Sequence, residues 1–335
     1  MGPYTASHLN PQGPGDARPT ALQIIHDESL EGKLTGKVIV ITGTTSGIGL
    51  EAARALSVTG ATLLLPVRDP EAAKAALDGI LEPGRVSLVK MDTSSFASVR
   101  EAAAAILTKS NNQVNILINN AGVMGIQNRE LTPDGHEKHF ATNHLGHFLL
   151  FQLLKSALLA SSTPEFQSRV VNVASSAHRV QPLGESDNYN FEKGGYHFGL
   201  AYSQSKLANV YMANELDRRY GQKGLRATSL CPGIVNTHMS RHVGKEFVDQ
   251  LLSGEGFIKR LKSWEQGAAT TVLAAVGKQW EGKGGRFLDN CAESERGEDD
   301  KDGFGIGYVS HTYDQANEER LWKDSLRIVG VEDDM

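Results

Sequence analysis

Short apolar runs alternate with longer stretches of mixed polarity along most of the chain. Five runs contain few polar residues: Lys37–Thr42, Ala61–Leu65, Val86–Lys90, Val114–Ile118 and Arg169–Val173. Each run is too short for a helix and too uniformly apolar for a strand with one face in water. We therefore predict buried parallel strands.

The stretches around these runs have the length and spacing of amphipathic helices. We predict helices at Ile48–Val58, Pro70–Leu81, Ser95–Thr108 and His136–Ala160, then a helix at Tyr202–Tyr220, a strand at Arg226–Leu230 and a helix near Glu265–Val276. This alternation predicts an α/β fold, with a single doubly wound parallel sheet of Rossmann type that has helices on both faces.

One domain is expected over residues 34–290, because no repeat and no linker rich in Pro, Gly or Ser divides it. Residues 1–33 begin with many Pro and Gly residues, and we expect them to form a flexible N-terminal extension. Residues 291–335 are expected to form a C-terminal extension that packs on the domain.

Two stretches interrupt the alternation. Ser176–Gly199 is a polar insertion between a predicted strand and the Tyr202 helix. Glu293–Gly307 combines acidic residues with glycines, and we interpret it as a solvated loop without a specific ligand.

Composition narrows the choice of function. The 335 residues are 40% hydrophobic and carry a formal net charge of −5, from 34 basic and 39 acidic residues. No basic run could follow a phosphate backbone, so nucleic acid is not an expected partner. No stretch approaches the roughly 20 apolar residues that span a bilayer, and the start does not resemble a secretory signal. Cys231 and Cys291 are expected to be reduced, and we predict a cytoplasmic protein without a membrane span.

A glycine-rich turn follows the first predicted strand and leads into a helix: Thr42-Gly43-Thr44-Thr45-Ser46-Gly47-Ile48-Gly49. Glycines let the backbone turn tightly and let a pyrophosphate approach the helix start, where the N–H groups and the dipole favour negative charge. The alternative is a turn without a ligand, but the strand–turn–helix context favours a dinucleotide site.

The end of the second strand indicates which dinucleotide binds. Dinucleotide folds often place an acid there for the ribose hydroxyls, whereas this chain has Val67 followed by Arg68. A guanidinium without that acid favours a 2′-phosphate, so we predict NADP(H) over NAD(H). Two alternatives remain: Arg68 pairs with Asp69 or Glu71, or Asp69 is itself the ribose acid.

Tyr202 and Lys206 lie four positions apart in a predicted helix and should share one face. A nearby ammonium stabilises a phenolate and lowers the pKa of the tyrosine, which makes the pair a candidate acid/base catalyst. A packed ring beside a solvated charge is the alternative.

Three motifs occur in a characteristic order: the glycine turn, Asn119-Asn120-Ala121-Gly122 after the fourth strand, and Tyr202-x-x-x-Lys206. With these motifs the chain resembles the classical short-chain dehydrogenases/reductases. The resemblance extends from Leu34 to about Asp289. The resemblance implies a nicotinamide cofactor and a tetrad of Asn143, Ser175, Tyr202 and Lys206, with Ser176 as the rival serine. In that family Tyr donates the proton, Lys also binds the cofactor ribose, and Asn orients a water.

The resemblance also assigns cofactor contacts. Asp92 occupies the position that contacts adenine, and the segment from Pro232 to Thr237 holds the carboxamide. The full expected set is Gly43, Thr45, Ser46, Gly47, Ile48, Gly49, Arg68, Asp92, Asn119, Ala121, Gly122, Tyr202, Lys206, Pro232, Gly233, Val235 and Thr237. No metal site is expected, because His144 and His147 have no third ligand at metal spacing and fit packing or capping roles better.

Further motifs are similar to the branch of retinol dehydrogenases and the WW-domain oxidoreductase: Asn-His-Leu-Gly-His-Phe from Asn143, and the tail Glu319–Ser325. We expect neither a membrane anchor nor a WW module in this chain, so the resemblance does not imply those specific activities. A homodimer is a possible assembly in this family.

The segment 238–264 resembles the family's variable substrate lid, and its apolar residues indicate a hydrophobic substrate. A helix pair that closes the core would look the same. In the insertion, five residues could line a substrate pocket or anchor a long loop: Tyr189, Phe191, Tyr196, His197 and Phe198.

We therefore expect an NADP(H)-dependent oxidoreductase that reduces a hydrophobic ketone to a secondary alcohol, with secondary metabolism as one setting. The alternatives are an isomerase or cyclase that uses the same pocket, and a regulator that binds NADP(H) without turnover.

Overall fold

An eight-stranded sheet forms the centre of the molecule, in the order β10-β9-β6-β5-β4-β1-β2-β3. The computed structural model describes residues 2–239 and 254–333. The strands of the sheet are β1 (Val38–Ile41), β2 (Thr62–Val67), β3 (Val86–Lys90), β4 (Ile116–Asn119), β5 (Ser168–Val173), β6 (Leu225–Cys231), β9 (Arg286–Asp289) and β10 (Ala292–Glu293). Neighbouring strands are parallel except β9 and β10. The predicted α/β fold with a doubly wound sheet is confirmed.

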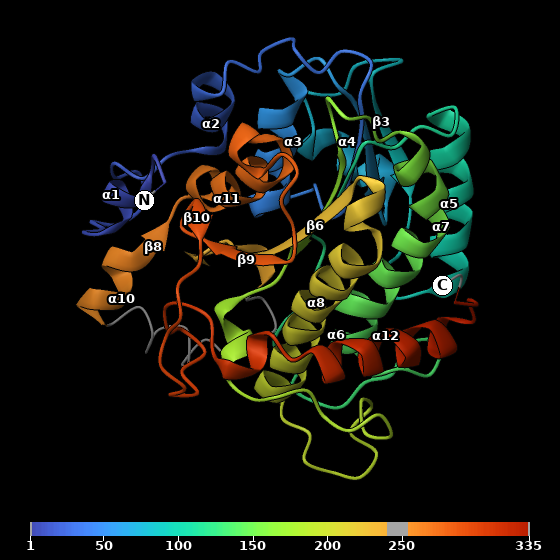
Figure 1. Cartoon of the computed structure of the whole chain (residues 1–335), viewed down its shortest axis with the longest axis vertical. Coiled ribbons are helices and arrows are strands. Elements are labelled where there is room, and N and C mark those ends of the chain that lie inside the picture. Colours follow the sequence, from blue (N-terminus) through green and yellow to red (C-terminus); the bar gives the residue numbers. More distant parts are fainter. Residues whose placement is uncertain (1, 240–253, 334–335) are drawn as a thin grey trace.

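Helices surround this sheet (Figure 1). They are α1 (Thr5–His8), α2 (Ala21–Asp27), α3 (Gly47–Ser57), α4 (Pro70–Ala76), α5 (Phe96–Lys109), α6 (Lys138–Phe140), α7 (Gly146–Ala160), α8 (Phe198–Tyr220), α10 (Glu255–Arg260), α11 (Trp264–Val276) and α12 (Gln315–Val329). A π-helical turn, Ala141–Leu145, joins α6 to α7, and a separate two-stranded sheet pairs β7 (Ile234–Val235) with β8 (Leu261–Lys262). None of these described helices is long and apolar enough to cross a membrane.

Both faces of the sheet are buried, which explains the uniformly apolar strands. Along β1, Val38 and Val40 belong to the core under α5, α7, α8 and α12, whereas Ile39 and Ile41 belong to the core under α2, α3 and α11. Figure 1 shows these two groups of helices on opposite sides of the sheet. The sheet therefore supports two hydrophobic cores.

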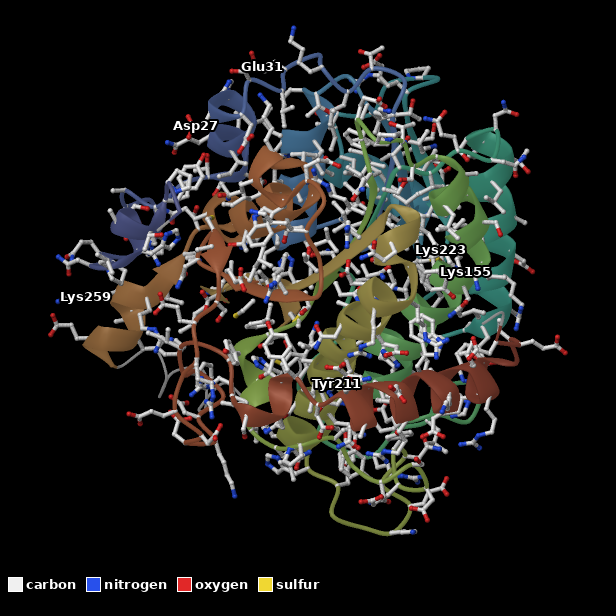
Figure 2. All side chains as sticks on the ribbon, in the orientation of Figure 1. Asp27, Glu31, Lys155, Tyr211, Lys223 and Lys259 are labelled. Carbon is white, nitrogen blue, oxygen red and sulfur yellow. The ribbon has the colours of Figure 1, made fainter. Side chains whose placement is uncertain are left out.

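The C-terminal extension is part of the domain. Beyond residue 290, β10 pairs with β9 at the edge of the sheet. Leu321, Trp322 and Leu326 of α12 enter the core against α7 and α8. Tyr211, labelled on α8 in Figure 2, donates a hydrogen bond to the His311 carbonyl at 2.6 Å. The expected domain boundary at residue 290 therefore falls inside the sheet.

The N-terminal extension also packs on the domain. Ile24 and Ile25 of α2 are fully buried, and Arg18 is almost fully buried. The Gln266 amide at the start of α11 hydrogen-bonds to the carbonyls of Asp16 and Arg18. A buried arginine and two buried isoleucines thus join the extension to the domain, whereas its expected flexibility stays a prediction.

Candidate functional site

A cavity of about 880 Å³ opens at the carboxyl ends of the central strands. The strand order reverses at β1, and such a switch point is where α/β sheets bind ligands. The cavity is lined by these predicted site residues: Gly43, Thr45, Ser46, Gly47, Ile48, Gly49, Arg68, Asp92, Ala121, Gly122, Ser175, Tyr202, Lys206, Pro232, Gly233, Val235 and Thr237.

The glycine turn is packed so closely that side chains are excluded. Gly43 has a φ of +73°, and a Cβ there would lie 2.7 Å from the Ala121 Cα. A Cβ on Gly49 would lie 2.2 Å from the Gly43 carbonyl oxygen. The Ser46 side chain does not cap α3, so the first N–H groups of this helix remain available to an anion. The turn fits a pyrophosphate.

Arg68 is exposed at the edge of the cavity, directly after β2. The acids that could have neutralised it have other partners. Asp69 accepts hydrogen bonds from the N–H groups of Glu71 and Ala72 at the start of α4, and Glu71 pairs with Lys74 at 2.7 Å. Among the described residues, Arg68 makes no salt bridge within 4.0 Å, which leaves its guanidinium available to a ligand.

Tyr202 and Ser175 meet in the wall of the cavity. The tyrosine comes from the first turns of α8 and the serine directly follows β5, so their hydroxyls lie side by side. The Tyr202 hydroxyl donates to the Met239 sulfur at 3.9 Å, and the Ser175 hydroxyl accepts from the Ala177 N–H at 3.1 Å. The polar insertion between them leaves the sheet as an outer loop (Figure 1). Ser176, the rival serine, donates instead to the Gly303 carbonyl at 2.7 Å. The geometry therefore favours Ser175 over Ser176.

Lys206 lies one turn after Tyr202 and is almost fully buried. Its Nζ donates to the Val173 carbonyl at 3.0 Å and lies 5.6 Å from the centroid of the Tyr202 ring. Burial lowers the pKa of Lys206 to about 8. Burial also raises the pKa of Tyr202 above its ordinary value, and the Ser175 hydrogen bond only partly opposes this. The expected lowering of the tyrosine pKa by Lys206 is therefore wrong for this geometry, because desolvation dominates.

A family model described as short chain dehydrogenase matches residues 37–247. The chain belongs to the short-chain dehydrogenase family. That family comprises oxidoreductases with a nicotinamide cofactor, and the chemistry of the glycine turn fits such a group.

Several relatives match most of this short-chain dehydrogenase. The chain is 47% identical over 331 residues to the short-chain dehydrogenase/reductase prx1 of Penicillium rubens, and the match covers 98% of this chain and 96% of the relative. Human retinol dehydrogenase 13 is 34% identical, with 89% and 86% of the two chains covered. A WW domain-containing oxidoreductase of Gallus gallus is 37% identical, with 82% and 66% covered. These matches confirm the branch indicated by the sequence.

A crystal structure of a putative uncharacterized protein from Mycobacterium paratuberculosis has the same fold. It superimposes with a TM-score of 0.67 at 29% sequence identity, and the match covers 94% of this chain and 99% of the other.

Two predicted site residues do not line the cavity. The Asn119 amide donates to the Asn172 side chain at 2.8 Å and so joins β4 to β5. The Asn143 side chain accepts from the Val123 N–H at 2.8 Å and donates to the Val123 carbonyl and the Ser205 hydroxyl. Both amides are thus engaged in supporting the cavity wall. The water-orienting role of Asn143 stays a prediction.

Thr42 and His147 form a network that sequence reasoning missed. His147 Nδ1 lies 2.9 Å from the Asn143 carbonyl oxygen and Nε2 lies 2.8 Å from the Thr42 hydroxyl. Burial lowers the pKa of His147 to about 4, so the ring is neutral, with its proton on Nδ1. Thr42 therefore donates to Nε2 and accepts from the N–H groups of Asn120 and Ala121. The network connects the glycine turn to the Asn143 turn.

The other histidine of the motif has a packing role. His144 Nε2 hydrogen-bonds to the Ser325 hydroxyl at 2.8 Å and thereby connects the π-helical turn to α12. Within residues 2–239 and 254–333, no group of three metal-ligating side chains is close enough to hold a metal ion.

The aromatic residues of the insertion mainly anchor it. Tyr189 stacks on Phe140 with 4.8 Å between ring centroids, and Tyr196 donates to the Ile126 carbonyl at 2.7 Å. Of the five candidates only Phe198 lines the cavity. The predicted lid is described at 238–239 and 254–264, whereas its residues 240–253 lie outside the described part of the chain. Phe257 and Leu261 of the described part line the cavity.

Proposed function

We propose that this short-chain dehydrogenase uses NADP(H) to reduce a hydrophobic ketone to a secondary alcohol. The observation that carries the proposal is the cavity wall, where the Tyr202 phenol lies beside Ser175 and the buried Lys206 Nζ lies 5.6 Å from the centroid of the Tyr202 ring. Tyr202, Ser175 and Lys206 are the proposed catalytic residues, with Asn143 as the fourth member of the tetrad.

Burial raises the pKa of Tyr202, so the phenol is protonated at neutral pH and available as a proton donor. A tyrosine that holds its proton at neutral pH can donate it to an oxygen that gains negative charge. The Ser175 hydroxyl donates a second hydrogen bond to the same oxygen. Lys206, still largely protonated below its pKa of about 8, stabilises the phenolate that Tyr202 leaves behind.

The cofactor, when bound, supplies the hydride that the carbonyl carbon receives. Gly43, Gly47 and Gly49 would hold its pyrophosphate, and Asp92 its adenine. The Arg68 guanidinium would hold a 2′-phosphate, which favours NADP(H) over NAD(H). Pro232, Gly233, Val235 and Thr237 would hold the carboxamide.

The substrate class follows from the apolar side chains that line the cavity. They are Val123, Met124, Val180, Phe198, Met239, Phe257, Leu261 and Phe304, and Met239 contacts the Tyr202 hydroxyl. Such a surface favours the apolar part of a ketone, while Ser175 and Tyr202 are the polar groups that fix the position of its carbonyl. A cytoplasmic location and a homodimer stay predictions.

The test is a comparison of NADPH consumption with alcohol formation on a panel of cyclic ketones. Equal amounts of NADP⁺ and alcohol are expected, with slower reaction when NADH replaces NADPH. Rearranged product without net NADPH consumption would indicate an isomerase or cyclase. Tight NADPH binding without any consumption across the panel would indicate a binding protein.

A further inference from the structure

Two phenylalanines that are far apart in the sequence meet at the cavity. Phe257 comes from α10 and Phe304 from the loop 296–307, which follows β10. Their ring centroids are 5.4 Å apart at an interplanar angle of 82°, and both rings line the cavity. The Arg260 guanidinium donates to the Phe304 carbonyl. Together, Phe257 and Phe304 form what we call the aromatic wall.

The loop 296–307 is folded around a buried arginine. Arg179, with 1% of its side chain exposed, donates to four loop carbonyls and pairs with Asp300 at 2.7 Å. The four carbonyls belong to Glu298, Asp302, Ile306 and Gly307. A Cβ on Gly305 would lie 2.6 Å from this guanidinium. The acidic residues of the loop are exposed, as expected for a solvated loop, while its carbonyls and Asp300 also bind Arg179.

This loop is also tied to the strand that carries Ser175. Arg179 and Ser176 both follow β5, and the Ser176 hydroxyl donates to the Gly303 carbonyl at 2.7 Å. Gly303 itself lines the cavity beside Phe304. The hydrogen bonds from Arg179 and Ser176 to the loop thus set the position of Phe304 relative to the proposed catalytic Ser175.

A second buried arginine holds the other half of the aromatic wall. Arg18, with 3% of its side chain exposed, pairs with Asp16 at 2.8 Å. It donates to the Arg260 carbonyl at 3.0 Å and to the Leu261 carbonyl at 2.5 Å, at the end of α10. In Figure 1, the N-terminal segment around α1 lies beside α10 and β8. The N-terminal extension therefore fixes the helix that carries Phe257.

We propose that the aromatic wall determines substrate specificity, and that Arg18 and Arg179 are the residues that position it. This inference rests on the proposed function and adds to it a substrate class: ketones whose apolar part is a fused or bulky ring system that reaches Phe257 and Phe304. Compact ketones contact Ser175 and Tyr202 without needing the wall. Neither arginine touches the substrate; each acts through the ring that it holds.

The chain offers a matched control for the two arginines. Arg169, with 5% of its side chain exposed, donates to the Ala274, Ala275 and Gly277 carbonyls at the end of α11 and pairs with Glu281. It does not line the cavity, and the helix end that it holds does not either. Arg169→Met thus removes the same kind of buried contact without touching the aromatic wall.

The experiment measures ketone binding to the protein saturated with NADP⁺, by calorimetry, because oxidised cofactor and ketone cannot exchange hydride. The probes are trans-1-decalone, which is bulky, and cyclohexanone, which is compact. We expect Phe304→Ala and Phe257→Ala each to weaken decalone binding about tenfold, since most of a phenyl contact is lost. Cyclohexanone and NADP⁺ should bind with unchanged affinity.

Arg18→Met and Arg179→Met should reproduce this selective loss, whereas Arg169→Met should lower thermal stability without changing the ratio of the two ketone affinities. If either arginine variant does not fold, Gly305→Ala replaces Arg179→Met, and Asp16→Asn replaces Arg18→Met. Phe166→Ala, outside the cavity, is the control for the phenylalanines.

Three results would overturn the proposal. The parent protein does not bind decalone, the wall variants lose the same affinity for both ketones, or Arg169→Met changes the ratio of the two ketone affinities as much as Arg18→Met and Arg179→Met do. Failure of the proposed function looks different. In that case decalone still binds and responds to the wall variants, but NADPH and decalone together give no alcohol.

Discussion

The cavity has two parts that are built in different ways. The glycine turn, Arg68 and Asp92 come from short segments that directly follow β1, β2 and β3. The aromatic wall depends on residues near positions 18, 179, 257 and 304, which only the complete fold brings together. In the first part, the shape depends on the backbone and on close packing. In the second part, it depends on buried guanidinium groups that donate hydrogen bonds to carbonyls.

The difference indicates how the two parts can change. A phosphate-binding turn allows little variation, because a single Cβ at Gly43 or Gly49 would meet backbone atoms. The aromatic wall consists of side chains on segments held at a few points, so its shape can change while the sheet stays the same. We therefore expect substitutions in the two parts to have separable effects on cofactor binding and ketone binding.

The largest effect is expected at Tyr202, between the two parts. Tyr202→Phe removes the proton donor and should reduce the rate of ketone reduction by about 10²- to 10⁴-fold. NADPH affinity should stay close to that of the parent protein, because the ring remains. Rates from NADPH absorbance and affinities from fluorescence titration check this. Turnover near the parent level would remove Tyr202 from the mechanism.

The next effect concerns the glycine turn. Gly49→Ala places a Cβ where the Gly43 carbonyl lies and should weaken NADPH binding by about 10- to 100-fold, as expected when a packed site must shift. Gly256→Ala is the control, because a Cβ there meets nothing within 4 Å. If the two variants bind NADPH equally well, the turn does not hold the pyrophosphate.

Arg68 should have a smaller and more selective effect. Arg68→Ala removes a charge-assisted contact to a 2′-phosphate and should weaken NADPH binding about tenfold, with NADH binding unchanged. Lys74→Ala, on the neighbouring helix α4, should alter neither affinity. Equal losses for both cofactors would show that Arg68 does not distinguish them.

The smallest expected effect is a pH dependence of turnover. Because burial lowers the pKa of Lys206 to about 8, the ammonium is present below that pH and is lost as the pH rises through it. The rate at saturating NADPH and ketone should therefore fall on the alkaline side of about pH 8. A rate that stays constant to pH 10 would contradict a role for the charged form of Lys206.

The sequence predicted the cofactor side of this molecule better than the substrate side, for physical reasons. Buried parallel strands and a glycine turn are local patterns, so β1 to β6 and the turn could be recognised. The short strands β9 and β10 were missed, because two to four residues carry little periodicity. The helix α12 was also missed, although it buries one face and its apolar residues have helical spacing.

Long-range contacts explain the remaining differences. Nothing near Arg179 in the sequence indicates that it binds carbonyls more than 100 positions later. The acidic residues of that loop are exposed, and their pattern does not reveal that the loop carbonyls bind a guanidinium. Similarly, Asn119 belongs to a recognised motif, but only the neighbouring Asn172 shows that its amide connects two strands.

The most direct test of the account uses NADPH that carries deuterium at the transferable position of the nicotinamide. The account predicts one deuterium on the carbinol carbon of the alcohol for each NADPH consumed, detected by mass spectrometry. With Tyr202→Phe, labelled alcohol should form about 10²- to 10⁴-fold more slowly. Product without deuterium at that carbon, or product formed without consumption of the labelled cofactor, would contradict the proposed hydride transfer.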